Sequence, residues 1–309
     1  ELGVTRVELG VQSLSDAVYD KVNRGHTVDD VVRSTKTLKD AGLKVGYHLM
    51  PGLFSDIEAD LEMFRKVFED PRFRPDSLKI YPTLVMEGTG LYDMWNRGEF
   101  EPYSVEEALK VICKVKKIMP KWVRTMRIQR DIPAQLIAAG VKKGDLGDLV
   151  YRRLREEGVR CRCIRCRDAG HLTYREGIDV GKVEILKAEY EASDGVEYFI
   201  SAEDVENDAL VGYIRLRLPS NSAHRKEIST ETALVRELKV LGQALRLGER
   251  SAETGQHEGF GELLLKEAEE LSMEQSMEKI LITSAIGTRD YYRKFNYERI
   301  GPYMGKRLN

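Results

Sequence analysis

The first 130 residues alternate short β-branched runs with amphipathic stretches, and this order restricts the fold more than any other feature. The runs cover residues 4–13, 44–51, 76–84 and 123–130. Helices are predicted near 15–24, 27–41, 56–70 and 104–118, the third opened by Ser55-Asp56 and the fourth by Ser104 ahead of Glu106 and Glu107. Alternating strands and helices predict an α/β fold with a parallel sheet and crossover helices.

Polar residues stand near the ends of these predicted strands. In parallel sheets, binding and catalytic groups collect at the carboxyl ends of the strands. A polar residue there often only caps the next loop, so each residue alone is a weak indication. The candidates are Glu8, Gln12, His48, Lys79, Tyr81 and Gln129.

The remaining sequence has a different pattern. Residues 131–180 are helical and basic and carry three of the four cysteines. Residues 181–309 predict four antiparallel strands, a helix from Glu258 to about Met273, a strand at 279–285, a helix at 289–294 and a short tail strand. We therefore expect three parts, at 1–130, 131–180 and 181–309, the last with an α+β order.

Charge is distributed unevenly along the chain. The net charge is −2, but residues 110–175 hold 18 basic and 6 acidic residues, which leaves 31 basic and 45 acidic residues elsewhere. A basic region of this size is typical of a surface that binds a phosphate backbone, and a solvated helix face is the alternative. No apolar run approaches the ~20 residues of a membrane helix, so we expect no membrane association through a spanning segment.

A compact cysteine cluster, C-x-C-x-x-C, is formed by Cys161, Cys163 and Cys166. Disulfides between such close neighbours are strained, which favours metal ligation, and zinc takes four ligands in a closed site. His171 is the candidate fourth ligand and Cys113 a weaker one. Unliganded thiols are one alternative; an iron–sulfur cluster is another, although the spacing does not match the usual cluster loops.

The segment Gln256-His257-Glu258-Gly259-Phe260-Gly261 lies between a predicted strand and a predicted helix. Backbone N–H groups at a helix N-terminus, unobstructed at the glycines, suit a pyrophosphate.

In this context the motif Q-x-x-G-x-G resembles the acetyl-CoA loop of the GCN5-related N-acetyltransferase family. The resemblance implies that the strand containing Glu237, Leu238 and Val240 splays from its neighbour and pairs with the pantetheine arm. It also implies that Tyr292 supplies the general acid, with Tyr291 beside it, although one of the two tyrosines is expected to be a core aromatic. Asn296 replaces the usual glycine, which a left-handed conformation tolerates.

Several longer blocks, including VELGVQS, LKIYPTLV, RIQRDIP, VRELKVLG and GTRDYYRKFNYE, resemble the family of the catalytic subunit of Elongator. The resemblance implies a radical-SAM partial TIM-like barrel, a metal-binding linker and an acetyltransferase-like domain. Its implied activity is carboxymethylation at C5 of the tRNA wobble uridine (U34), with acetyl-CoA as carbon source. Its implied cofactors are S-adenosylmethionine, near Glu8, Gln12, His48 and Lys79, and a [4Fe–4S] cluster.

The cluster cysteines normally follow the first barrel strand, and the chain begins without an initiator Met. We therefore expect an N-terminally truncated barrel whose cluster ligands lie outside this chain. The resemblance further implies cytoplasmic location and either Elongator-like partner subunits or a homodimer. The residues expected to hold the tRNA backbone are Arg124, Arg127, Arg130, Lys142, Lys143, Arg152 and Arg153.

Side chains at 124, 127 and 130 cannot all face one side of a regular strand, so at least one is expected to do something else, such as pairing with Asp131. Two alternative functions stay open. A protein lysine acetyltransferase would use the same C-terminal domain, with Glu237 as its base. A non-catalytic RNA-binding scaffold would not need the glycines at 259 and 261.

Overall fold

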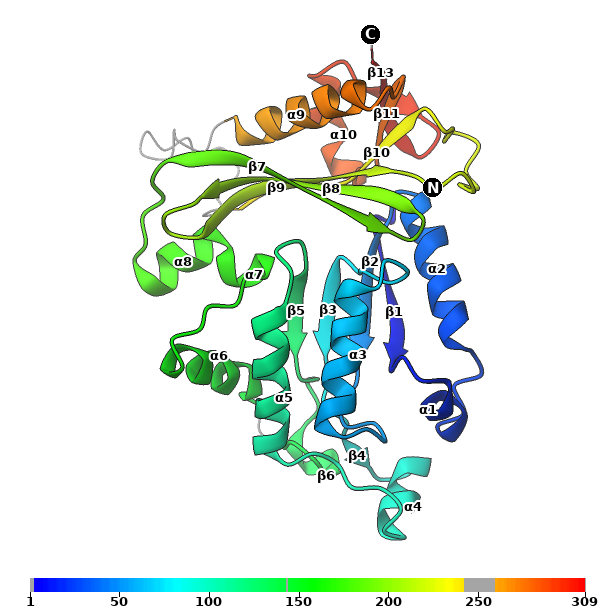
Figure 1. The fold of residues 1–309 in the computed structure, drawn as a ribbon, viewed down its shortest axis with the longest axis vertical. Helices are drawn as coiled ribbons and strands as arrows, with labels where there is room; N and C mark the ends of the chain where they lie inside the picture. Colours follow the sequence, from blue (N-terminus) through cyan, green and yellow to red (C-terminus); the bar gives the residue numbers. More distant parts are fainter. Residues whose placement is uncertain (1–2, 143, 242–258, 309) are drawn as a thin grey trace. The chain divides into compact units, whose positions relative to one another are not determined.

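A computed structural model describes residues 3–142, 144–241 and 259–308. Contacts divide the chain into two compact units (Figure 1). The first, which we call the N-side unit, contains residues 8–34 and 45–164, and the second, the C-side unit, contains the described residues of 1–7, 35–44 and 165–309. The three sequence-based boundaries stay a prediction, because they follow composition and not contacts.

Four parallel strands form the first sheet, in the order β1-β2-β3-β5, as the alternating pattern predicted. They are β1 (Arg6–Gln12), β2 (Lys44–Leu49), β3 (Ser77–Ile80) and β5 (Arg124–Ile128). The helices between them are α1 (Asp16–Lys21), α2 (Val28–Asp40), α3 (Ile57–Glu69) and α5 (Val105–Ile118). The predicted caps are confirmed, since Asp56 caps α3 and Ser104 forms a capping box with Glu107 at α5.

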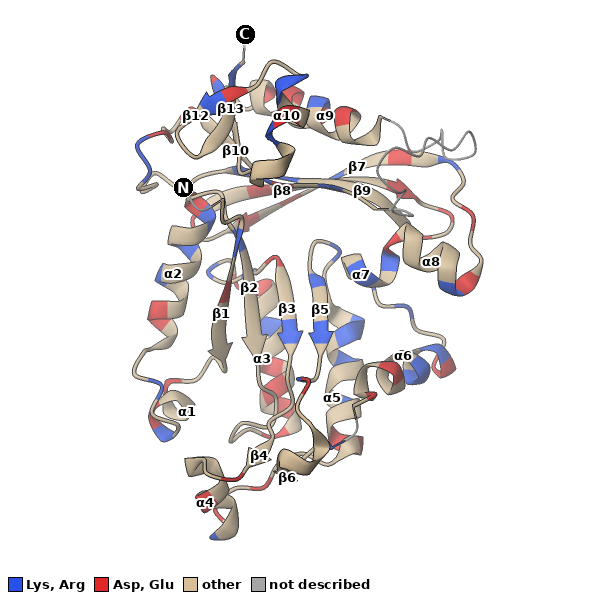
Figure 2. Ribbon diagram, turned by 180° about the vertical axis from the view of Figure 1, so that it is seen from behind, with Lys and Arg blue, Asp and Glu red and all other residues tan. Residues whose placement is uncertain are grey.

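The two faces of this sheet differ in polarity. Val45, Tyr47 and Leu49 of β2 are fully buried, as are Leu78 and Ile80 of β3. Figures 1 and 2 show α3 and α5 against one side of the sheet. The alternate positions of each strand point to the other side, which is free to carry polar groups.

A small insertion and the basic linker complete this part of the chain. The insertion, which the sequence pattern did not predict, consists of β4 (Val85–Met86), α4 (Gly90–Asn96), a 3₁₀ turn (Ala134–Leu136) and β6 (Ile137–Ala139), with β4 antiparallel to β6. The linker is helical as expected, with α6 (Leu146–Glu156), α7 (Ile164–Arg167) and α8 (Ala169–Glu176).

The second sheet has seven strands in the order β12-β13-β11-β10-β9-β8-β7. The strands are β7 (Val183–Ala192), β8 (Gly195–Asp204), β9 (Ala209–Leu218), β10 (Thr232–Val240), β11 (Lys279–Ile282), β12 (Glu298–Ile300) and β13 (Tyr303–Arg307). The helices are α9 (Phe260–Glu274) and α10 (Arg289–Arg293), preceded by a 3₁₀ turn (Ile286–Thr288). Strands β7 to β10 are antiparallel, as predicted, and β10 runs parallel to β11.

The tail differs from the single strand that we expected. Gly301, at a φ of 58°, reverses the chain between β12 and β13, so the tail forms a hairpin. Asn296 takes the left-handed conformation, with a φ of 64°, that its position was predicted to require. In the described ranges no helix combines the length and the apolarity that crossing a membrane requires.

Candidate active site

Three of the predicted S-adenosylmethionine residues meet on the polar face of the first sheet. His48 of β2 and Lys79 of β3 are paired in register, and Glu8 projects from β1 on the same side. Glu8 Oε2 lies 2.8 Å from His48 Nε2 and also accepts a hydrogen bond from Lys79 Nζ. Each of these side chains is about one quarter exposed. The face therefore presents a partly accessible group of one carboxylate, one imidazole and one ammonium.

Gln12 lies at the carboxyl end of β1 and lines a neighbouring hollow of about 630 Å³. Its backbone is left-handed, with a φ of 63°, where the strand ends. The same hollow is lined by cations that the sequence analysis did not select: Lys21, Arg24 and Arg97. Lys21 and Arg24 fall in the helix predicted near 15–24, and Arg97 lies in a segment without a predicted element. No motif distinguishes them from ordinary surface cations.

The loop that follows β2 contributes Met50 and Leu53 to the lining of this hollow. A buried carboxylate, Asp60, holds that loop in place. Asp60 accepts hydrogen bonds from Gly52 N at 2.7 Å, Ser55 Oγ at 2.7 Å and Tyr103 Oη at 2.6 Å. Burial raises the pKa of Asp60, and the three hydrogen bonds oppose that rise. Asp60 was not predicted, because one of its partners, Tyr103, is 43 residues away in the sequence.

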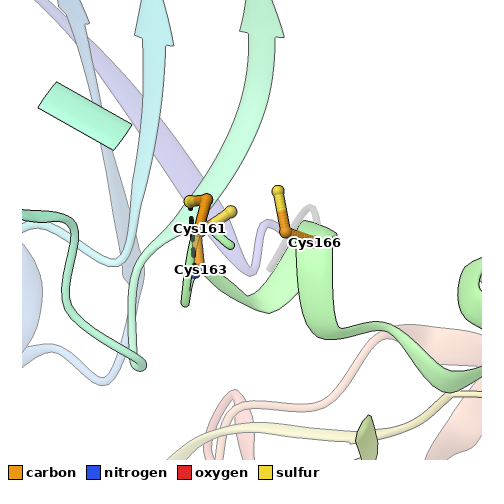
Figure 3. Close-up of side chains that lie close together, drawn as sticks. All are labelled: Cys161, Cys163 and Cys166. Atoms are coloured by element: carbon orange, nitrogen blue, oxygen red, sulfur yellow. Dashed lines mark hydrogen bonds between the residues drawn. The ribbon is translucent and has the colours of Figure 1, made fainter. Parts of the chain in front are cut away.

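The sulfur atoms of Cys161, Cys163 and Cys166 lie within 4.8 Å of one another (Figure 3). This is the arrangement that a shared metal ion requires, and it is the one such group among the described residues. Neither His171 nor Cys113 belongs to the group. Cys113 is buried, its Sγ lies 3.9 Å from Val150 O, and burial raises the pKa of its thiol.

Two polar side chains next to Cys163 were also not predicted. Lys116 Nζ lies 3.3 Å and Thr125 Oγ1 lies 3.4 Å from Cys163 Sγ. The Lys116 ammonium is fully buried and donates a hydrogen bond to Thr125 Oγ1 at 3.0 Å. Both groups lie within hydrogen-bonding distance of the sulfur, in a fully buried position.

The predicted acetyl-CoA loop is only partly described. Gln256, His257 and Glu258 lie outside the described residues. Gly259 caps α9 with a φ of 107°, and among the described residues no atom beyond its chain neighbours and its own helix lies within 4 Å of the position where its Cβ would be. At Gly261 an added Cβ would lie 2.5 Å from Tyr291 Oη and 3.7 Å from Val240 Cγ2. The start of α9 thus has open space at one glycine and a close aromatic hydroxyl at the other.

The strand next to this loop separates from its parallel partner. Strands β10 and β11 are paired from Thr232 to Val235, and β10 then continues to Val240 without β11. Among the described residues no strand pairs with this side of β10 beyond Val235, a position at which an extended ligand could add to the sheet. Phe260 and Leu238 pack against the apolar core, whereas Val240 is exposed.

The two predicted tyrosines have different surroundings. Tyr292 is buried in the core beneath α9, and burial raises its pKa to about 12. Tyr291 is only partly buried, contacts the Tyr292 ring edge-on and carries the hydroxyl that lies over Gly261. Tyr292 is thus the core aromatic that the sequence predicted one of them to be, and Tyr291 is the one whose hydroxyl reaches the loop.

Glu237 is engaged by cations. Its carboxylate accepts a hydrogen bond from Arg215 Nε at 3.1 Å and lies 3.4 Å from Lys44 Nζ. Both carboxylate oxygens of Glu237 are thus occupied by cations and are not directed at an acceptor groove. This geometry disfavours the base that a lysine acetyltransferase would require.

His171 lies beside the same end of β10 and not with the cysteines. With Asp168, Gly170 and Tyr174 it lines a hollow of about 370 Å³ against Lys239, Val240 and Leu241. Tyr174 is 85% exposed. The linker helix α8 therefore contributes an imidazole and an aromatic ring to the surface around the open half of β10.

The basic residues predicted for RNA have mixed surroundings, and Figure 2 shows Lys and Arg along β5 and α6. Arg127 pairs with Asp131 at 2.6 Å, which confirms the pairing expected from strand parity. Arg153 donates two hydrogen bonds to Glu106, and Arg130 lies 5.9 Å from the Tyr81 ring centre. The other predicted residues divide as follows: Lys142 and Arg152 are exposed, Arg124 is half-buried, and Lys143 lies outside the described residues.

Comparison with known families matches two parts of the chain. Residues 1–67 match the radical SAM superfamily, and residues 75–156 match the radical SAM C-terminal domain.

The full length is similar to several curated proteins. The tRNA uridine(34) acetyltransferase of Methanocaldococcus jannaschii is 54% identical over 100% of this chain and 58% of its own length. Elongator complex protein 3 is 43% identical in Saccharomyces cerevisiae and 42% identical in Homo sapiens, over 99% of this chain and 56% of each protein. The chain thus spans somewhat more than half the length of these relatives.

A solved structure has the same fold. The archaeal Elp3 of Methanocaldococcus infernus, with an N-terminal deletion, superposes with a TM-score of 0.93 at 53% identity, covering 99% of this chain and 73% of that one. The fold expected from the sequence, a radical-SAM partial barrel and an α+β acetyltransferase-like domain joined by a linker, is confirmed.

Proposed function

Since this chain belongs to the Elongator complex protein 3 family, we propose that it modifies the wobble uridine of tRNA. The reaction proposed is carboxymethylation at C5 of U34, with acetyl-CoA as the carbon source and S-adenosylmethionine as cofactor, in the cytoplasm. The observation that supports the proposal is that one chain contains two surfaces with groups suited to binding a cofactor. They are the polar face with Glu8, His48 and Lys79, and the open half of β10 beside Gly259 and Gly261.

For acetyl-CoA, the open backbone of β10 would pair with the pantetheine arm and the start of α9 would receive the pyrophosphate. Gly259 fits this role because it has no side chain and no described residue fills the position of its missing Cβ. Tyr291 would donate a proton to the departing thiolate, since its hydroxyl is the one that reaches the loop. Tyr292 would support Tyr291 by packing against its ring.

For S-adenosylmethionine, the fitting residues are charged groups on an accessible face. Glu8 would accept hydrogen bonds from the cofactor amino or ribose groups, and Lys79 and His48 would hold that carboxylate in position. Gln12 would contact the part that extends into the hollow. When bound with a [4Fe–4S] cluster, this cofactor supplies a radical able to remove hydrogen from a C–H bond.

For zinc, the donor set fits a soft metal ion. Three sulfur atoms within 4.8 Å of one another would provide three of four ligands, and Lys116 would offset their negative charge. We assign the three cysteines to zinc and propose no [4Fe–4S] ligands within the chain. His171, the fourth ligand predicted from the sequence, lies apart from the cysteines beside β10 and is not assigned to the ion. Metal analysis tests this assignment: Cys163→Ser should lose zinc, and Cys113→Ser should keep it. Stoichiometric zinc in Cys163→Ser would remove Cys163 from the ligand set.

For tRNA, the exposed members of the basic linker would contact phosphates, so affinity should fall steeply with salt. Titration of labelled tRNA at several salt concentrations measures the slope. An affinity that is unchanged between low and moderate salt would contradict this part of the proposal.

The central experiment measures acetyl-CoA turnover with tRNA, with a histone-like peptide and with neither. We expect tRNA alone to stimulate turnover. Acetylation of the peptide would instead indicate a lysine acetyltransferase, and no turnover under any condition would indicate a scaffold.

A further inference from the structure

A basic hollow of about 900 Å³ lies in the C-side unit. Four cations and one carboxylate line it: Arg225, Lys226, Lys279, Arg299 and Glu227. The remaining lining residues are Ile300, Gly301 and Pro302, so no aromatic ring faces the hollow. Figure 2 shows the basic positions on the loop before β10 and on the β12–β13 hairpin.

The hollow is separate from the acetyl-CoA surface. Lys279 is the first residue of β11, whose parallel partner β10 begins at Thr232. The acetyl-CoA surface is the half of β10 from Arg236 to Val240, with the start of α9. Four residues of strand, about 13 Å, separate Thr232 from the beginning of that half.

The cations are held in place by the walls of the hollow. Lys279 Nζ donates a hydrogen bond to Glu227 O at 2.7 Å, and Arg225 Nη2 donates one to Glu227 Oε1 at 3.3 Å. Arg299 Nε donates to Gly301 O at 3.1 Å. Residue 227 thus orients one cation with its carboxylate and another with its carbonyl.

One wall of the hollow is the loop before β10, and the other is the β12–β13 hairpin. The Glu227 side chain of the loop contacts Gly301 of the hairpin. The Glu227 side chain is 7% exposed, and a Cβ at Gly301 would collide with its Oε1. Among the residues that the structure describes, Lys226, Lys279 and Arg299 form no ion pair, so their charges are available to a ligand. Lys279 and Arg299, which are held by backbone carbonyls and have no carboxylate partner among the described residues, are suited to binding phosphate, and the exposed Lys226 adds a third charge.

We propose that this hollow is a second phosphate-contact site for the tRNA backbone, remote from the basic linker. The proposal rests on the proposed tRNA-modifying function. The absence of an aromatic ring from the lining favours backbone contact without base stacking. A site of this kind would fix the orientation of the tRNA and leave its sequence unread.

The test compares two variants of the 309-residue chain, each lacking two exposed positive charges. The hollow variant is Lys226→Gln with Arg299→Gln. The control is Lys182→Gln with Lys266→Gln, whose side chains are 84% and 71% exposed and pair with Glu184 and Glu270. Binding of fluorescent tRNA is measured by anisotropy across a salt series, and circular dichroism checks that both variants stay folded.

We expect the hollow variant to bind tRNA about tenfold more weakly at 0.1 M salt. The slope of the logarithm of its binding constant against the logarithm of salt concentration should become less steep by about one to two. The control should stay within about twofold of the unmodified chain. Equal losses in both variants, or no loss in the hollow variant, would overturn the inference and leave the proposed function standing. Failure of the unmodified chain to bind tRNA would overturn both.

Discussion

At the scale of single residues, two adjacent tyrosines of the short helix α10 have different roles. Tyr292 points into the core beneath α9, whereas the Tyr291 hydroxyl reaches the first turn of that helix. Burial raises the pKa of both, and Glu262 adds to the rise at Tyr291. Both phenols therefore keep their protons at neutral pH.

The first prediction separates these roles by removing each hydroxyl. Tyr291→Phe should lower kcat for tRNA-dependent acetyl-CoA turnover about 100-fold, because it removes the proposed proton donor. Tyr292→Phe should change kcat only a few-fold. Because the pKa of Tyr291 is raised above its ordinary value, near 10, kcat should not fall through tyrosine ionisation between pH 7 and pH 9. A larger loss in Tyr292→Phe than in Tyr291→Phe would reverse the assignment.

The second prediction concerns the glycine beneath that hydroxyl. Gly261→Ala places a methyl group 2.5 Å from Tyr291 Oη and should displace the ring. A displacement of this kind should reduce acetyl-CoA turnover about 10- to 100-fold. Gly287→Ala is the matched control, since no atom lies within 4 Å of its Cβ position. Wild-type turnover in Gly261→Ala would show that the tyrosine and the glycine do not act together.

At the scale of elements, the loop after β2 shows how a segment without regular structure is held at a site. Its Gly52 N–H is satisfied by Asp60, on the first turn of α3, and Tyr103 reaches the same carboxylate oxygen from the segment before α5. One side chain therefore joins a loop, a helix start and a distant aromatic residue. The loop in turn supplies Met50 and Leu53 to the hollow at Gln12.

The third prediction follows from the raised pKa of Asp60. A carboxyl group whose pKa is higher in the folded than in the unfolded chain favours folding in its protonated form. That contribution is fully present below the unfolded pKa, near 3.8, and is lost as pH rises through the folded value. Asn is uncharged at every pH, as the protonated carboxyl group is. The free energy of unfolding of Asp60→Asn, minus that of wild type, should therefore increase as pH rises from 4 to 7.

Urea unfolding at several pH values measures this difference in the free energy of unfolding. Glu62→Gln, on the exposed surface of the same helix, is the control. A stability difference between Asp60→Asn and wild type that does not vary with pH would contradict the prediction. Asp60→Ala should cost about 1–3 kcal/mol, because it leaves buried donors without an acceptor.

At the scale of the whole molecule, a buried ionic cluster joins segments that are distant in sequence. Within the C-side unit, Glu197 of β8 pairs with Arg217 of β9 at 3.0 Å, Arg236 of β10 at 2.7 Å and Lys39 at 3.4 Å. All four side chains are fully buried. Asp40 adds a second carboxylate by accepting from Arg217 and Ser220. Residues 35–44 are thus held against the second sheet by charges that have no access to water.

The fourth prediction tests this cluster. Glu197→Gln removes the carboxylate shared by three buried cations and should lower the free energy of unfolding by about 3–5 kcal/mol. Glu184→Gln, which removes an exposed partner of Lys182, should cost at most about 0.5 kcal/mol. Hydrogen exchange of the β8–β10 amides measures both. Equal protection in the two variants would show that the cluster does not stabilise the sheet.

Short-range patterns explain what could be predicted. The strands and helices of the first sheet, the caps at Asp56 and Ser104, and the Arg127–Asp131 pair depend on residues close together in sequence. The cysteine group was likewise predictable, because its three members lie within six residues. The position of His171 was not, because its neighbours on β10 are about 70 residues away.

The sequence alone therefore determined the α/β and α+β order, the basic centre, the cysteine group and the glycine-marked start of α9. Periodicity, capping and local spacing act over a few residues and can be read without knowing how the chain packs. Only the tertiary structure decided that Tyr291 faces the loop and that Glu237 is paired. It also decided that Glu197, Arg217 and Arg236 are buried together. Burial and ion pairing depend on which distant segment covers a surface. Residues 35–44 cover the charged side chains of the second sheet only once the chain has folded.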